Sequence, residues 1–178
     1  MTDYYYFAAG FTGTVDAVHN AIPEVRYAGT IPNGQAYKAF FLVEATPTTD
    51  LGRVAQKLTN QGATGLKRTP AGKQWGPNVL KNSQPDTSEA WTLIKVAGQT
   101  PSAVGQAVGQ LAGVPGVAEV GFNDVGFNVL ANAAAGDDTA LGAVVGTVMA
   151  AAGVDPTTEH PTVGAKFWRA PQQPQPNP

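Results

Sequence analysis

The sequence has 178 residues, of which 43% are hydrophobic and only 13% are charged, and its formal net charge is -2. Typical domains carry about 25% charged residues, so uncharged groups must cover most of this surface, which suits contact with partners. The sequence contains no cysteine, which excludes disulfide frameworks, thiolate nucleophiles and cysteine-bound metals.

No segment of the sequence has the pattern of a membrane-directed or membrane-crossing element. Residues 1–6 lack the basic segment followed by an apolar core that a secretory signal needs. The most apolar stretch, residues 140–152, is shorter than the roughly 20 residues that cross a bilayer. We therefore expect a soluble protein without a membrane partner, in a compartment that the sequence leaves open.

The first half of the chain alternates between strand and helix patterns. Thr14 and Asp50 stand where side-chain oxygens cap the first turn of a helix, and Pro23 and Gly62 stand where those helices end. Period-two alternation of apolar residues predicts the strands. In chain order we expect a strand at 4–9, a helix from Thr14 to Pro23, strands at 25–31 and 36–45, a helix from Asp50 to Gly62 and a strand at 64–68.

The second half repeats this plan. "WTLIKVAG" alternates as a strand, Thr100 and Pro101 begin a helix, and Pro115-Gly116 ends it. Residues 118–122 and 127–133 read as two strands joined by a turn, and Asp137 or Asp138 caps a helix that runs to about residue 152. Residues 163–168 read as the last strand. The order strand, helix, strand, strand, helix, strand is the ferredoxin-like motif.

These patterns predict an α+β protein made of two tandem ferredoxin-like halves with antiparallel sheets. Residues 71–89 are rich in proline, glycine and polar residues, as in a linker or a long surface loop. Residues 170–178 favour an extended polyproline tail. The expected organisation is a first half at 1–70, a linker at 71–89, a second half at 90–169 and a tail at 170–178.

Two short motifs in the second half carry a resemblance. Residues 114–117 read "VPGV" at the end of a helix, and Gly126-Phe127-Asn128 follows a hairpin turn. Over about 75 residues this half resembles the effector-binding domain of leucine-responsive and asparagine-type regulators, where "LPGV" and a glycine, aromatic, aspartate turn hold these places. The resemblance implies a ferredoxin-like fold and a ligand pocket lined by Asn123, Asp124 and Asn128 at a subunit interface.

The reactive residue types do not form a recognisable catalytic or metal-binding pattern. His19 and His160 are the only histidines, and both read as packed or surface imidazoles. Asp137 and Asp138 fit a helix start better than a cation site, and no serine lies in a nucleophile elbow. We predict no catalytic, cofactor-binding or metal-binding residues. An enzyme of the dimeric ferredoxin-like barrel type, with an aromatic pocket and one histidine, stays open as an alternative.

The last predicted helix carries no charge between residues 140 and 153. A helix that is apolar all round is normally buried all round, so we expect either the other half of the chain or a second copy to cover it. Gly142 and Gly146 would allow the backbone of that cover to come close.

Charge is unevenly distributed along the chain. Residues 51–85 hold six basic residues and no acidic one: Arg53, Lys57, Lys67, Arg68, Lys73 and Lys81. Residues 96–165 hold six acidic residues and no basic one: Glu119, Asp124, Asp137, Asp138, Asp155 and Glu159. The basic stretch fits the acidic region of a neighbouring copy, plain solvated surface, or nucleic acid with Trp75 for stacking, which the net acidic charge disfavours.

These features together predict a non-enzymatic structural or assembly protein whose partner is itself or a larger protein assembly. The composition is similar to that of accessory proteins that decorate or cement phage capsids, which implies a place in a virion. The alternative is a small-ligand-binding regulatory domain of the ferredoxin-like effector type. The candidate interface comprises the six basic residues with Glu119, Asp124, Asp137, Asp138, Gly142 and Gly146.

Overall fold

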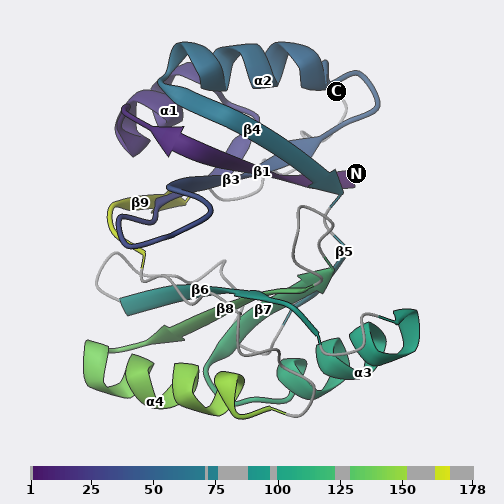
Figure 1. Ribbon diagram of the computed structural model, residues 1–178. Coiled ribbons are helices and arrows are strands. Elements are labelled where there is room, and N and C mark those ends of the chain that lie inside the picture. The colour runs from purple at the N-terminus through teal and green to yellow at the C-terminus, as the bar shows by residue number, and fades with distance from the viewer. Residues whose placement is uncertain are drawn as a thin grey trace, which may run out of the picture.

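The computed structural model describes residues 2–70, 72–75, 88–96, 100–122, 129–151 and 163–168. Over these residues the protein is an α+β fold with two antiparallel sheets that face each other, and the helices lie on the two outer sides (Figure 1). The predicted fold class, tandem ferredoxin-like halves, is confirmed.

The first sheet is built by the first half of the chain, with one addition. Its strand order is β4-β1-β3-β2-β9, and α1 and α2 cover its outer face (Figure 1). The elements are β1 (Thr2–Phe11), α1 (Val15–Ala21), β2 (Val25–Thr30), β3 (Ala39–Ala45), α2 (Leu51–Asn60), β4 (Ala63–Pro70) and β9 (Lys166–Trp168).

The second sheet has the strand order β5-β7-β8-β6, with α3 and α4 on its outer face (Figure 1). Its elements are β5 (Gly72–Trp75), β6 (Ser88–Ile94), α3 (Pro101–Ala112), β7 (Val117–Phe122), β8 (Val129–Ala135) and α4 (Asp138–Met149). The turn that we expected to join β7 and β8, at 123–126, lies outside the described residues.

The two halves exchange their edge strands. β5, which follows the first half, pairs with β7 of the second sheet. β9, the strand expected to complete the second half, pairs instead with β2 of the first sheet. The segment expected to be a linker thus contributes a strand, and backbone hydrogen bonds from Val163 N to Glu89 O and from Gly164 N to Thr30 O hold the crossing at 163–165.

The helix starts follow the predicted caps. The side chains of Thr14, Asp50, Thr100 and Asp137 accept hydrogen bonds from backbone amides three residues further on, at 2.8–3.2 Å. Such caps stabilise a helix by about 1 kcal/mol each because they satisfy amides that lack a partner within the helix. Among the described residues, no helix is both long and apolar enough to cross a membrane.

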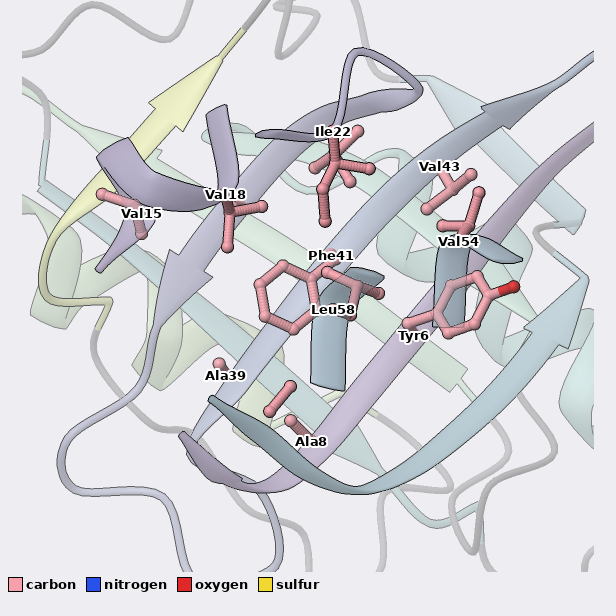
Figure 2. Packing of buried hydrophobic residues seen from close by; sticks show 13 residues of the cluster. Tyr6, Ala8, Val15, Val18, Ile22, Ala39, Phe41, Val43, Val54 and Leu58 are labelled. Atoms are coloured by element: carbon pink, nitrogen blue, oxygen red, sulfur yellow. The ribbon is translucent and has the colours of Figure 1, made fainter. Parts of the chain in front are cut away.

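Each helical layer packs on its own sheet through a mainly aliphatic core. Under α1 and α2, Val18, Ile22, Val54 and Leu58 meet Phe41 from β3 (Figure 2). Under α3 and α4, Val104, Val108, Leu111 and Val148 pack on the strands of the second sheet. These two cores fasten the helices to the outer faces of the sheets.

Helix α4, which carries no charge from residue 140 on, has an exposed outer face. Gly142 and Gly146 lie there, and a Cβ atom built on either would meet no atom within 4 Å among the described residues. The expectation that the other half of the chain covers this face is therefore wrong, because that half packs on the opposite side of the second sheet. Cover by a second copy stays a prediction.

Candidate functional site between the two sheets

The inner faces of the two sheets share one aromatic layer. Alternate residues of β1, β2, β3, β6 and β8 point inward, and they meet in a buried cluster. We call this cluster the central layer; it consists of Tyr5, Phe7, Tyr27, Ile31, Tyr37, Phe40, Leu42, Trp91, Leu93 and Leu130. It is the place where residues from both halves of the chain come together.

The rings of the central layer contact one another directly. The centroid of Trp91 lies 4.1 Å from that of Phe40 and 5.7 Å from that of Tyr27, and Tyr27 stacks on Phe40 at 5.2 Å. Gly29 lies beneath this stack: a Cβ atom there would lie 2.9 Å from Phe40 Cε1 and 3.1 Å from Tyr27 Cε1. A glycine at this position is therefore what allows the two rings to stack over β2.

One buried carboxylate joins three strands at this layer. Glu89, on β6, is 1% exposed. Its Oε2 accepts a hydrogen bond from Tyr27 Oη of β2 at 3.0 Å, and Lys166 Nζ of β9 lies 2.5 Å from the same oxygen. A carboxylate so deeply buried requires such partners, since an unpaired charge would be strongly destabilising.

The phenol in this group stays protonated at neutral pH. Burial raises the pKa of Tyr27 well above its ordinary value of 10.0, and the charge of the Glu89 carboxylate raises it further. Tyr27 therefore keeps donating its proton to Glu89 throughout the neutral range.

Several polar atoms facing the central layer are buried without a hydrogen-bond partner among the described residues. They are Tyr5 Oη, Glu89 Oε1, Trp91 Nε1 and both polar side-chain atoms of Asn132, Oδ1 and Nδ2. Asn132 stands directly opposite Trp91 in the β6–β8 register and is fully buried. Buried polar groups in proteins are nearly always hydrogen-bonded. These atoms are therefore available to something other than the described chain.

The predicted basic residues lie on elements of both sheets. Arg53 and Lys57 lie on α2, Lys67 and Arg68 on the edge strand β4, and Lys73 on β5 of the other sheet. Lys57 pairs with Glu24 at 3.3 Å, and the Arg68 guanidinium carbon lies 5.7 Å from the centroid of the Tyr4 ring. Lys81 lies outside the described residues.

The described acidic candidates belong to the second half of the chain, on β7 and at the start of α4. Asp137 caps α4, and Asp138 accepts a hydrogen bond from Ser88 Oγ at 2.5 Å. Glu119 lies on β7, opposite Asn132 in register. Asp124 lies outside the described residues. Lys73 and Glu119 lie on the paired strands β5 and β7. The other described basic and acidic candidates belong to different halves of the chain, and a role for any of them between copies stays a prediction.

Neither histidine marks the site. His19 packs edge-on against the Phe167 ring, with centroids 4.8 Å apart, on the outer side of the first sheet. His160, Asn123 and Asn128 lie outside the described residues. In the part of the chain that the structure describes, no three His, Asp or Glu side chains are grouped so that they could hold a metal ion.

Sequence reasoning missed the residues that converge on the central layer: Tyr27, Glu89, Asn132 and Lys166. One signal was present. Glu89 and Asn132 are ionisable or amide residues inside strands whose other residues are mostly apolar, "SEAWTLI" and "VLANAAA". A charged or amide side chain in a strand buried on both faces points to a buried polar site.

No protein-family model and no curated protein matches this sequence. Solved structures do match it. The siroheme decarboxylase NirDL in complex with an iron-uroporphyrin III analogue superposes with a TM-score of 0.67 at 9% identity, covering 94% of this chain and 72% of that chain. A second structure of NirDL gives 0.63 over the same shares, also at 9% identity. A putative monooxygenase from Fusobacterium nucleatum gives 0.51 at 12% identity, covering 95% of this chain and 97% of that chain.

At these identities the likeness establishes the ferredoxin-like fold alone. It corrects the expectation of a non-enzymatic structural protein that decorates a phage capsid. That prediction is wrong, since solved structures that share this fold include a decarboxylase and a putative monooxygenase. The prediction of a structural protein depended on composition and surface charge. Neither of them contains information about the interior, where the polar groups of the central layer lie.

Proposed function

We propose that this protein binds a small, ring-containing organic molecule at the central layer between its two sheets. The observation that carries the proposal is the set of buried atoms of Tyr5, Glu89 and Asn132 that lie among aromatic rings and have no hydrogen-bond partner among the described residues. Leaving such atoms unsatisfied costs about 1–3 kcal/mol each, and a bound molecule with complementary groups removes that cost. Apolar walls with a few converging polar groups are the usual composition of small-molecule sites.

The ring contacts favour a small ligand over a large one. Trp91, Phe40 and Tyr27 touch across the two sheets at centroid distances of 4.1–5.7 Å. A molecule as large as a tetrapyrrole would have to separate the sheets and break these contacts. A compound of one or two rings would disturb fewer of these contacts.

The test combines a ligand panel with an Asn132→Leu variant. We expect one- and two-ring compounds to raise the melting temperature of the wild type. At a ligand concentration of 100 times the dissociation constant, the free energy of unfolding should rise by about 2.7 kcal/mol. Asn132→Leu should lose this response. Without ligand it should be more stable than the wild type by about 1–3 kcal/mol, because it removes an unpartnered amide.

The matched control is Asn20→Leu, at an exposed position of α1. This variant should respond to ligand as the wild type does. The proposal fails if no compound stabilises the wild type and Asn132→Leu is less stable than the wild type. That pair of results would mean that Asn132 is satisfied by buried water and serves the fold alone.

Catalysis on the bound molecule is a second candidate function. It is favoured by the Glu89 carboxylate, which is shielded from water and hydrogen-bonded to a phenol, with an ammonium group at the same oxygen. Groups of this kind transfer protons in active sites. Mass spectrometry of panel compounds after incubation would detect conversion, and Tyr27→Phe should slow it roughly 100-fold or more while binding is retained. Conversion at the same rate in this variant would exclude the role.

A further inference from the structure

The two oxygens of Glu89 differ in their partners. Tyr27 donates to Oε2, and Lys166 lies against the same atom. Oε1 is equally buried, and none of the described residues donates to it. A carboxylate oxygen can only accept hydrogen bonds, so Oε1 requires an O–H or N–H donor.

The charges around Glu89 are already balanced, so a second buried charge beside it would be unfavourable. Lys166 already balances the carboxylate, and its side chain is 13% exposed. An anionic ligand beside Oε1 would place a second negative charge in a buried layer, and a cationic ligand would add an unbalanced positive charge. Either is strongly unfavourable where water is excluded.

Asn132 supplies a second contact at a fixed separation. Glu89 stands opposite Ala134 in the β6–β8 register, and Trp91 stands opposite Asn132. Glu89 and Asn132 are therefore diagonal neighbours on one face of the sheet, and the Cα atoms of such neighbours are typically about 7–8 Å apart. Asn132 offers both a donor and an acceptor, so it accepts many ligands and does not discriminate between a neutral group and an anion.

We infer that Glu89 determines the specificity of this site: it selects neutral ring compounds that carry an O–H or N–H donor and rejects carboxylates. This inference rests on the proposed binding function. Asn132 and the rings hold the body of such a ligand, and Oε1 accepts its proton donor. The ligand class is thus that of phenols, naphthols and cyclic amides.

Three probes of one shape separate the possibilities: naphthol, which has a donor; methoxynaphthalene, which has none; and naphthoate, which is an anion. Titration calorimetry on the wild type should show naphthol binding about 10-fold to 100-fold more tightly than methoxynaphthalene, as for hydrogen bonds to charged groups. Naphthoate should bind most weakly.

Glu89→Gln should reduce the preference for naphthol over methoxynaphthalene to less than threefold, because a glutamine can turn its N–H groups towards the ligand. Glu24→Gln breaks the Lys57–Glu24 pair on the outside of the first sheet, and it should keep the wild-type order. Circular dichroism shows whether each variant is folded.

The outcomes distinguish the inference from the function on which it rests. If methoxynaphthalene or naphthoate binds the wild type as tightly as naphthol, or if a folded Glu89→Gln keeps the full preference, the inference is wrong while the binding function stands. If none of the probes or the wider panel binds, the proposed function itself is wrong. Should Glu89→Gln not fold, the order of the three probes on the wild type still decides.

Discussion

Tyr5 and Tyr6 are neighbours on β1, are both almost fully buried, and point to opposite faces of the first sheet. Tyr6 faces the helices (Figure 2), and its Oη donates to the backbone carbonyl of Leu51 at 3.0 Å. Tyr5 faces the central layer, where none of the described residues takes or gives a hydrogen bond at its Oη. The same side chain at the same burial is thus satisfied on one face and not on the other.

The difference indicates two kinds of core. The layer under α1 and α2 is mainly aliphatic, and its buried tyrosine ends on a backbone carbonyl. The central layer is aromatic and keeps polar atoms of Glu89 and Asn132 without described partners. Protein sites that give up local stability in this way are commonly functional ones. This contrast is the basis for placing the ligand between the sheets.

The largest effect is expected when a methyl group is added at a buried glycine of the central layer and, for comparison, at an exposed glycine of α4. Gly29→Ala should lower the free energy of unfolding by about 1–3 kcal/mol, because the new Cβ overlaps the Phe40 and Tyr27 rings. Gly142→Ala, on the open face of α4, should raise it by up to about 1 kcal/mol through helix propensity. Urea denaturation measures both, and effects of the same sign would contradict the packing described for the central layer.

A smaller difference in stability is expected between the variants Tyr5→Phe and Tyr6→Phe. Tyr6→Phe removes a made hydrogen bond and should cost about 0.5–1.5 kcal/mol of stability. Tyr5→Phe removes a hydroxyl without a described partner, so the ligand-free protein should be unchanged or slightly more stable. Thermal unfolding of the two variants side by side tests this, and an equal loss in both would remove the contrast between the faces.

The third effect is a difference in the pH dependence of stability between the wild type and Tyr27→Phe, and it appears only above about pH 10. The folded-state pKa of Tyr27 lies well above 10.0, through burial and the Glu89 charge, whereas the unfolded chain titrates near 10. The stabilisation from protonated Tyr27 is therefore fully present below about pH 10 and is lost as the pH rises through the folded-state value. The free energy of unfolding should fall less steeply above pH 10 in Tyr27→Phe than in the wild type, and identical slopes would argue against a buried phenol.

Local signals in the sequence predicted the helices and strands, whereas long-range packing determines which sheet the short strands join. Thr14, Asp50, Thr100 and Asp137 cap helices through atoms three residues away, so their role is readable from the sequence. The short strands β5 and β9 exchange between sheets, and their partners β7 and β2 are set by contacts across the fold. No pattern within β9 itself shows which sheet it joins.

The site was hidden for a related reason. Alternation in β6 places Glu89 and Trp91 on one face, but it does not say that this face meets a second sheet. Only that meeting brings Tyr27 and Lys166 to Glu89, from positions 62 residues before it and 77 residues after it. The composition and charge that suggested an assembly protein describe the surface, which the site does not use.

The most direct measurement is a proton–nitrogen correlation NMR spectrum of the Asn132 side-chain amide, assigned with Asn132→Leu and followed during titration with naphthol. We expect this signal to shift along the same saturation curve as the calorimetric binding, because the ligand contacts Nδ2 or Oδ1 of Asn132. An Asn132 signal that stays in place while naphthol binds would show that the ligand lies elsewhere, and it would contradict the placement of the site between the two sheets.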